Sequence, residues 1–279
     1  MPPRKKTPRN KSTPLQPATP EYVRPPSGPS NLLIILLIAV SFFAGYLFFR
    51  LQSLEQGKKD TVTQNLPQKA QPVALGQIKK LFSNDYIHFG NADKKVLFAE
   101  ILDPSCPYCH VAGGRDSELS KQTGRFQYIT NGGTYTPPVP EMRKLVDEGK
   151  ASYAVIYSPG HGNGEVAMET LYCAFDSGKF WEVHDKLMSY EGYTLINDKV
   201  QNNKANVSLV VNFLGDIVDP QTLKTCIESG KYDQRLQKEQ QLSQALGFQG
   251  TPHFFVNTTS FGGAYDYKQI QPVVDSALK

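Results

Sequence analysis

Two cysteines separated by two residues stand where a buried strand gives way to a helix. The run Cys106-Pro107-Tyr108-Cys109 follows the almost wholly apolar segment Val96 to Leu102, which predicts a central β-strand covered on both faces. A thiol at a helix N-terminus faces unpaired N–H groups and the positive end of the helix dipole, which stabilise thiolate over thiol. We therefore predict Cys106, nearer the helix end and more exposed, as the nucleophile. Cys109, one turn further in, is the predicted resolving thiol, so that the pair forms a redox-active disulfide.

The same residues fit two other chemistries. Cys106-Pro-Tyr-Cys109-His110 also matches the C-x-x-C-H pattern of c-type haem attachment, which would make the chain an electron-transfer protein. Against haem, the motif follows a buried strand and a proline follows its first cysteine. A four-cysteine zinc site is disfavoured because the second pair, Cys173 and Cys226, is separated by 52 intervening residues, where zinc sites have about two to four. We predict no metal and no cofactor, since the other histidines show no ligand spacing: His88, His161, His184 and His253.

Charge and hydropathy divide the chain into a tail, an anchor, a tether and a body. Residues 1–30 hold nine prolines, six basic residues and one acid, and are predicted to be disordered. The chain's net charge is +4, which leaves −1 on the other 249 residues, so we expect no nucleic-acid partner. Within residues 31–49, an uncharged run of 18 residues would rise about 27 Å as a helix, close to a bilayer core of about 30 Å. Residues 50–76 are the predicted tether.

The apolar segment is predicted to be an uncleaved transmembrane signal anchor. A cleaved signal peptide is the alternative, but its apolar region is about 7–15 residues long and ends in a small-x-small site. Phe48-Phe49-Arg50 offers no such site. Most basic residues precede the span, and the positive-inside rule then favours a cytoplasmic N-terminus. The predicted location is the cell membrane, crossed once, with an extracytoplasmic catalytic domain at residues 77–279.

Strand and helix patterns in the body predict an α/β fold with one helical insert at about residues 163–247. Asp219-Pro220 is an N-cap followed by proline at the first helical position. Asp266 with Gln269 resembles a capping box for the last helix, which Pro272 is expected to kink or to delay. The expected strands are Tyr86 to Phe89 and Val96 to Leu102, paired as a hairpin, then Ala151 to Tyr157, His253 to Asn257 and Phe261 to Tyr265.

Three further segments, together with the CPYC run, resemble the DsbA-like thiol–disulfide oxidoreductases. These segments are residues 178–185 (GKFWEVHD), 229–232 (SGKY) and 246–257 (LGFQGTPHFFVN). The resemblance covers about residues 85–279 and implies a thioredoxin-like fold with a helical insertion domain. It also implies that the bond before Pro252 is cis and that this proline faces the active disulfide. Thr251 would then present its backbone to an extended substrate segment, and Pro107 and Tyr108 would tune the redox potential.

Glu100 is a candidate proton acceptor for Cys109. The family often keeps a buried acid at this place, beneath the second cysteine. A carboxylate in a nearly all-apolar strand has a raised pKa and can exchange a proton with a nearby thiol. The alternative is that Glu100 lies at a solvated edge of the sheet.

Residues 110–150 depart from the family's pattern. Gly113-Gly114 and the stretch from Gly132 to Pro138 interrupt what is usually a plainer helix. The sequence leaves the role of this segment open.

The second cysteine pair is predicted to be a structural disulfide. Cys173 and Cys226 lie at apolar positions of two predicted helices. An oxidising compartment favours pairing of thiols that can meet, and four cysteines leave no odd thiol once Cys106 and Cys109 are matched. The alternative is two separate buried free thiols, because free cysteine is among the most buried residue types.

These observations predict a membrane-anchored protein-disulfide oxidoreductase. Its substrates are expected to be exported proteins that contain cysteine. The resemblance favours an oxidase whose dithiol is reoxidised by a quinone-linked membrane oxidase. A disulfide isomerase or reductase of the same fold is the alternative, and a non-enzymatic peptide-binding module is the alternative of another class.

Overall fold

The computed structural model describes residues 40–41, 73–248 and 250–279. The predicted tail, most of the predicted anchor and most of the predicted tether lie outside these residues. Within the described ranges, no helix combines the length and the apolar composition that a bilayer crossing requires. The chain divides into two units, Met1–Leu66 and Pro67–Lys279, and the fold described below is that of the second.

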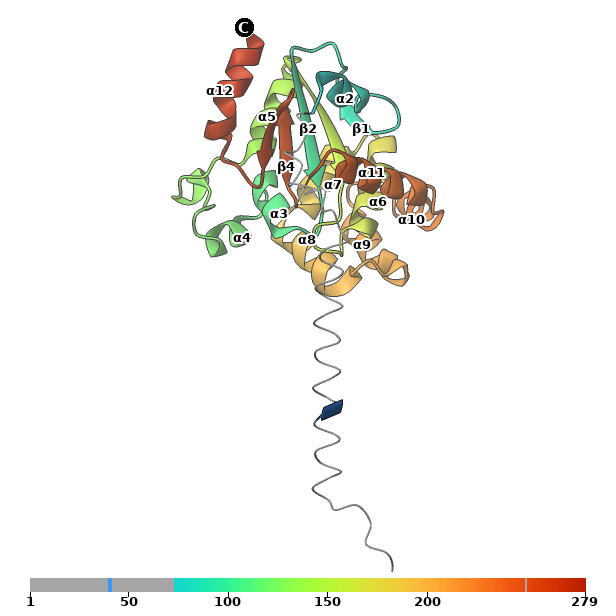
Figure 1. Ribbon diagram of the computed structural model, residues 1–279. Helices are drawn as coiled ribbons and strands as arrows, with labels where there is room; N and C mark the ends of the chain where they lie inside the picture. Colours follow the sequence, from blue (N-terminus) through green and yellow to red (C-terminus); the bar gives the residue numbers. More distant parts are fainter. Residues whose placement is uncertain (1–39, 42–72, 249) are drawn as a thin grey trace, which may run out of the picture. The chain divides into compact units, whose positions relative to one another are not determined.

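A five-stranded mixed sheet forms the centre of this unit (Figure 1). The strand order is β1-β3-β2-β4-β5. β2 and β3 run parallel, whereas β1 on β3, β4 on β2 and β5 on β4 are antiparallel. Every residue of β2 and β3 is buried, which explains why both read as continuous apolar runs. The strands are β1 (Ile87–Phe89), β2 (Val96–Leu102), β3 (Ala151–Tyr157), β4 (His253–Val256) and β5 (Thr259–Gly262).

The expected hairpin between β1 and β2 is wrong. β1 pairs with β3, and Ile87 lies opposite Val155. β2 already has β3 on one edge and β4 on the other, so the edge open to β1 is the far side of β3. The turn residues after Phe89 indicate where the chain reverses, but they do not determine which strand it pairs with.

Helices cover both faces of the sheet. Alternate strand residues point to opposite faces, so Phe98 and Tyr153 join the larger core whereas Leu97 and Ala154 join the smaller one. The larger core packs against α3 (Pro107–Gly113), α5 (Pro138–Asp147), α6 (Glu165–Asp176) and α12 (Tyr267–Leu278). The smaller core packs against α2 (Leu75–Lys80) and α11 (Asp233–Ala245).

The described residues between β3 and β4 form helices joined by short loops, as expected for the insert. A disulfide joins Cys173 on α6, the first helix of the insert, to Cys226 on α10. The insert also contains α7 (Phe180–Leu187), α8 (Tyr190–Thr194), the π-helix Leu195–Val200, the 3-10 turn Lys204–Asn206, α9 (Val207–Phe213) and α10 (Pro220–Glu228). Between α3 and α5 lie α4 (Ser117–Gln122) and the 3-10 turn Ile129–Asn131.

Two helices begin at the capping residues expected from the sequence, whereas the effect of Pro272 and the bounds of β5 differ from the prediction. Asp219 caps α10 by accepting a hydrogen bond from the Thr222 N–H, and Asp266 with Gln269 forms the expected capping box of α12. Pro272 does not delay α12, which begins at Tyr267. β5 begins at Thr259, earlier than expected, because Asn257 adopts a positive φ of 53° and turns the chain tightly after β4.

Candidate active site

The CPYC run lies at the start of α3. Cys106 is the N-cap, with extended φ and ψ of −79° and 121°, and Pro107 takes the first helical position, where its missing N–H costs nothing. Cys109, one turn in, donates its backbone N–H to the Cys106 carbonyl at 3.0 Å. Both side chains are free thiols and buried. The prediction that Cys106 is more exposed than Cys109 is therefore wrong.

The segment before β4 covers the sulfur of Cys106. The Thr251–Pro252 peptide bond is cis, and the Cys106 thiol donates a hydrogen bond to the Thr251 carbonyl oxygen at 3.1 Å. The Pro252 carbonyl accepts a hydrogen bond from the Gly263 N–H at 2.8 Å. Within the described residues the Thr251 hydroxyl is buried and has no hydrogen-bond partner, so it is free to donate to a thiolate.

The pKa values of the two thiols are shifted in opposite directions. The Cys109 thiol, which can donate a hydrogen bond to the Cys106 thiolate, lowers the pKa of Cys106 to about 6 despite its burial, and the Thr251 side chain contributes to the same shift. Burial raises the pKa of Cys109, and the neighbouring Cys106 raises it further. A low-pKa sulfur is a good leaving group and a ready thiolate, whereas a high-pKa sulfur holds its proton. This division matches the predicted roles of attacking and resolving thiol.

Glu100 is buried in the middle of β2, with 1% of its surface exposed. It stands between Val155 of β3 and Phe254 of β4, so the alternative of a solvated edge is wrong. The Tyr153 hydroxyl donates a hydrogen bond to Glu100 Oε2 at 2.6 Å. Burial raises the pKa of Glu100, and Glu100 in turn raises the pKa of Cys109 through charge repulsion. The carboxyl group is thus electrostatically coupled to the second thiol.

Asp103 is a site residue that the sequence interpretation missed. It is fully buried directly after β2. Its Oδ1 accepts hydrogen bonds from the N–H and hydroxyl of Ser105, and its Oδ2 accepts from the N–H groups of Gly160 and His161, both at 2.7 Å. The carboxylate therefore joins the loop that carries Cys106 to the loop after β3. An acid at the carboxyl end of a buried parallel strand was the available signal.

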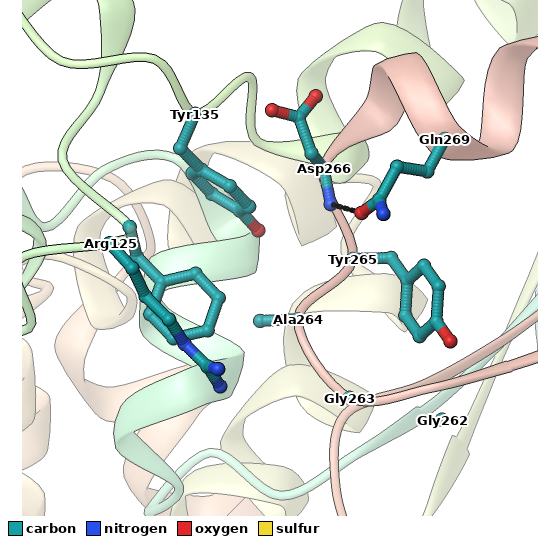
Figure 2. A pocket seen from close by; sticks show the side chains of 9 residues that line it. Arg125, Tyr135, Gly262, Gly263, Ala264, Tyr265, Asp266 and Gln269 are labelled. Atoms are coloured by element: carbon teal, nitrogen blue, oxygen red, sulfur yellow. Dashed lines mark hydrogen bonds between the residues drawn. The ribbon is translucent and has the colours of Figure 1, made fainter.

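A pocket of about 350 Å³, whose lining residues are drawn in Figure 2, lies next to the CPYC run. One wall comes from the segment between α3 and α5, and Phe126 of this wall packs edge-to-face on the exposed ring of Tyr108 at 5.6 Å. The other wall is the turn between β5 and α12, which contains Gly263. The segment that departs from the family's pattern thus lies beside the dithiol.

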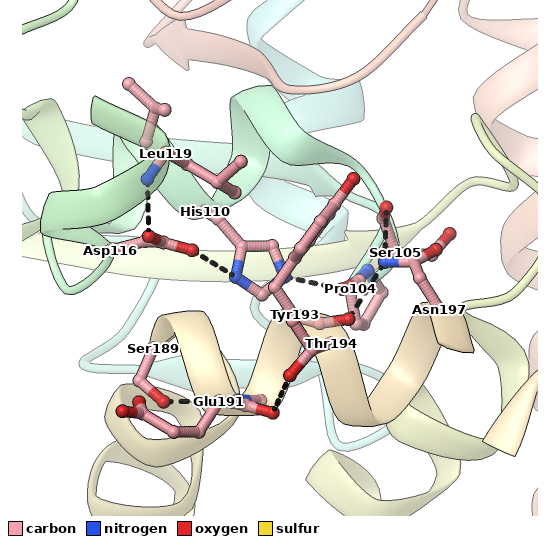
Figure 3. A network of polar contacts seen from close by, with 12 residues as sticks. Pro104, Ser105, His110, Asp116, Leu119, Ser189, Glu191, Tyr193, Thr194 and Asn197 are labelled. Carbon is pink, nitrogen blue, oxygen red and sulfur yellow. Dashed lines mark hydrogen bonds and ion pairs between the residues drawn. The ribbon is translucent and has the colours of Figure 1, made fainter. Parts of the chain in front are cut away.

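His110, a residue of α3, is fully buried, and Figure 3 shows its ring between Pro104 and Asp116. Its Nε2 donates a hydrogen bond to the Pro104 carbonyl at 2.8 Å. Its Nδ1 lies 3.9 Å from Asp116 Oδ2, and in the described part of the chain neither atom has a hydrogen-bond partner. Burial lowers the pKa of His110 to about 4 and raises that of Asp116 to about 6. A ring enclosed in this way does not fit the haem-ligand role in C-x-x-C-H.

No three His, Cys, Asp or Glu side chains in the described ranges are grouped to hold a metal ion.

The thioredoxin family model matches residues 140–276, which run from α5 into α12. Disulfide bond formation protein D of Bacillus subtilis is 23% identical over 201 residues, covering 68% of this chain and 76% of the relative.

Solved structures show the same fold. Oxidised BdbD from Bacillus subtilis superposes with a TM-score of 0.53 and 20% identity, covering 70% of this chain and 93% of that one. The α-DsbA1 protein of Wolbachia pipientis gives a TM-score of 0.51, with 15% identity and coverage of 70% and 92%. The chain therefore has the thioredoxin-like fold of the DsbA-type proteins to which it is similar. The predicted enzyme class, protein-disulfide oxidoreductase, agrees with the names of these relatives.

Proposed function

We propose that this DsbA-type protein oxidises cysteine pairs of exported proteins through Cys106 and Cys109. The observation that carries the proposal is the pairing of a lowered Cys106 pKa with a raised Cys109 pKa beside a cis-proline segment that touches the Cys106 sulfur. A stabilised thiolate favours the dithiol form and so makes the disulfide a stronger oxidant.

The proposed reaction begins from the Cys106–Cys109 disulfide. A substrate thiolate attacks the Cys106 sulfur, the bond between the two cysteines breaks, and its electron pair stays on the Cys109 sulfur. Because the pKa of Cys109 is high, this sulfur takes a proton, which protonated Glu100 supplies. A second substrate thiolate then attacks the substrate sulfur of the mixed disulfide. The substrate leaves oxidised, and Cys106 leaves as a thiolate.

The catalytic cycle requires an external oxidant, because each turnover leaves two electrons on the dithiol. We propose that a quinone-linked oxidase in the membrane takes these electrons. The name of the Bacillus subtilis relative, disulfide bond formation protein D, supports the oxidising direction.

The reduction potential of the Cys106/Cys109 couple tests this direction. We expect a value near that of a strong oxidant, about −120 mV, where isomerases lie near about −180 mV and thioredoxin near about −270 mV. The measurement is equilibration with glutathione, followed by acid quenching and mass analysis of the alkylated protein. A potential at or below the thioredoxin value would assign the protein as a reductase.

We also propose that the domain is anchored in the membrane by residues 31–49 and faces away from the cytoplasm. The uncharged run and the basic residues before it support this orientation. Protease added to intact spheroplasts should then degrade residues 77–279 and spare residues 1–30. A body that is protected until the membrane is opened would overturn the proposed topology.

A further inference from the structure

The pocket beside the dithiol is built from two segments that are far apart in the sequence. Arg125, Phe126 and Tyr135 come from the segment between α3 and α5, and the facing residues come from the turn between β5 and α12. The pocket is linked to the redox site on both sides. Phe126 packs on Tyr108 of the CPYC run, and Gly263 donates its N–H to the cis-proline carbonyl.

Hydrogen bonds hold the two walls together. The Thr136 N–H donates to Asp266 Oδ2 at 3.3 Å, and the Thr136 carbonyl accepts from the Tyr267 N–H at 2.9 Å. The Tyr128 hydroxyl donates to the Val111 carbonyl of α3 at 3.0 Å. The pocket therefore keeps a fixed position relative to Cys106, as a specificity site requires.

Two groups in the pocket can bind a ligand, since neither has a polar partner within the described residues. Tyr135 is 3% exposed, and its hydroxyl has no hydrogen-bond partner among the described residues. Figure 2 shows this hydroxyl pointing toward the turn at Ala264. The Arg125 guanidinium lies over the Phe126 ring at 4.5 Å and is not among the ion pairs of the described chain. A buried hydroxyl without a partner is costly, so Tyr135 favours a ligand that accepts hydrogen bonds. The exposed Arg125 guanidinium can pair with negative charge on the same ligand.

Asp266 also lines the pocket, but it forms no ion pair with Arg125. Its carboxylate already accepts hydrogen bonds from the N–H groups of Thr136 and Lys268, and in Figure 2 its side chain points away from Ala264.

Burial raises the pKa of Tyr135, so its hydroxyl keeps its proton at neutral pH and acts as a donor.

We propose that this pocket binds an acidic side chain of the substrate, close in sequence to the cysteine that reacts with Cys106. Arg125 and Tyr135 are then specificity-determining residues. The inference rests on the proposed function, because the substrate must run past the cis-proline with its cysteine at Cys106. A volume of about 350 Å³ lies at the low end for ligand sites and suits a single side chain.

Matched peptides test this proposal. Each carries two cysteines, with one Glu placed in turn at each position flanking the first cysteine, and its control has Gln at the same place. We expect one position at which Glu raises kcat/KM of peptide oxidation about fivefold over Gln, as befits a charged hydrogen bond at a partly exposed site. Added salt should reduce that preference.

Variants assign the preference to the pocket. Arg125→Gln should abolish the preference for Glu, and Tyr135→Phe, which keeps the ring, should reduce it. Lys121→Gln removes a positive charge from the same segment outside the pocket and should leave the preference unchanged. Lys121→Gln should also leave oxidation of the Gln peptides unchanged. An unchanged reduction potential of the Cys106/Cys109 couple in the Arg125→Gln and Tyr135→Phe proteins shows that their redox centre is intact.

The outcomes separate this proposal from the proposed function. Oxidation of all peptides at equal rates would overturn the acidic subsite and leave the oxidase in place. No oxidation of any peptide would overturn the oxidase itself. A Glu preference that survives Arg125→Gln would also overturn the subsite, because the charge would then be recognised elsewhere.

Discussion

The sulfur of Cys106 lies 3.1 Å from the carbonyl oxygen of Thr251, although 145 residues separate them in sequence. The thiol is the donor in this contact, so the hydrogen bond is lost when Cys106 ionises. The Thr251 hydroxyl is buried without a partner in the described structure and can donate to the thiolate alongside the Cys109 thiol. One residue thus contacts both protonation states of the nucleophile, through different atoms.

The two cysteines of the CPYC run should respond differently to substitution. Cys106→Ser removes the attacking sulfur and should abolish turnover. Cys109→Ser should leave a protein that accumulates mixed disulfides with substrates, because nothing resolves them. Non-reducing gels of both variants after incubation with a thiol substrate check this. Equal trapping by the two would contradict the assigned roles.

Alkylation of Cys106 should follow a titration with a midpoint near pH 6, because its pKa is lowered to about 6. Cys109→Ala removes the largest cause of this shift and should move the midpoint upward. Thr251→Val should move it upward by less. The rate of iodoacetamide labelling against pH, in the reduced protein, gives each midpoint.

The same shift predicts how pH changes the stability of the reduced protein. A pKa lowered on folding stabilises the folded state above the unfolded pKa, and this contribution is lost as pH falls through the folded pKa. Cys106 should therefore contribute less stability to the reduced form as pH falls from about 9 to about 6. The reduced Cys106→Ala variant should not show this part of the pH dependence.

Glu100→Gln should slow disulfide exchange by about tenfold or more, since proton transfer by a positioned side chain contributes at least this much. It should also stabilise the fold near pH 8, because a buried carboxyl with a raised pKa opposes folding once it ionises. Acid-quenched time courses give the rate of disulfide exchange, and thermal melts give the stability. A variant that is both slower and less stable would indicate a merely structural role.

Tyr153→Phe is the matched control for Glu100. The hydrogen bond from Tyr153 lowers the pKa of Glu100. The variant keeps the carboxyl group and removes this bond, so the pKa of Glu100 should rise. The pH profile of exchange should therefore shift to higher pH, with its maximum rate little changed. An unshifted profile would separate Glu100 from the rate-limiting proton transfer.

Replacing Cys173 and Cys226 together with alanine should reduce the free energy of unfolding by about 4 kcal/mol, from the loop closed between them in the chain-entropy model. Redox activity at Cys106 should remain, because the disulfide joins α6 to α10 within the insert. Urea unfolding of oxidised wild type and the double variant gives the difference. An unchanged midpoint would mean that the bridge adds no net stability.

Local patterns predicted the parts of the fold that local chemistry determines. β3 has the expected bounds because a run of apolar residues is enclosed on both sides by polar ones, and Asp219 and Asp266 act as the expected caps. The partner of β1 could not be predicted, because it depends on which sheet edge is left open.

The site followed the same division. Cys106 and Cys109 were identifiable from spacing and context. The burial of His110 against Tyr193 and the role of Asp103 depend on contacts between segments that are distant in the sequence. Tyr135 was missed for the same reason. Its environment is created by a turn more than a hundred residues later in the chain.

Asp103 has a mechanical consequence for the whole domain. Its buried carboxylate fastens the loop that opens the helical insert to the loop that carries Cys106. A hinge motion of the insert at this point would break two hydrogen bonds to a charged group, each contributing about 1.5–3 kcal/mol. We therefore expect the insert and the dithiol to move as one rigid body. Substrate exchange at Cys106 would then require no closing motion of the insert over the dithiol.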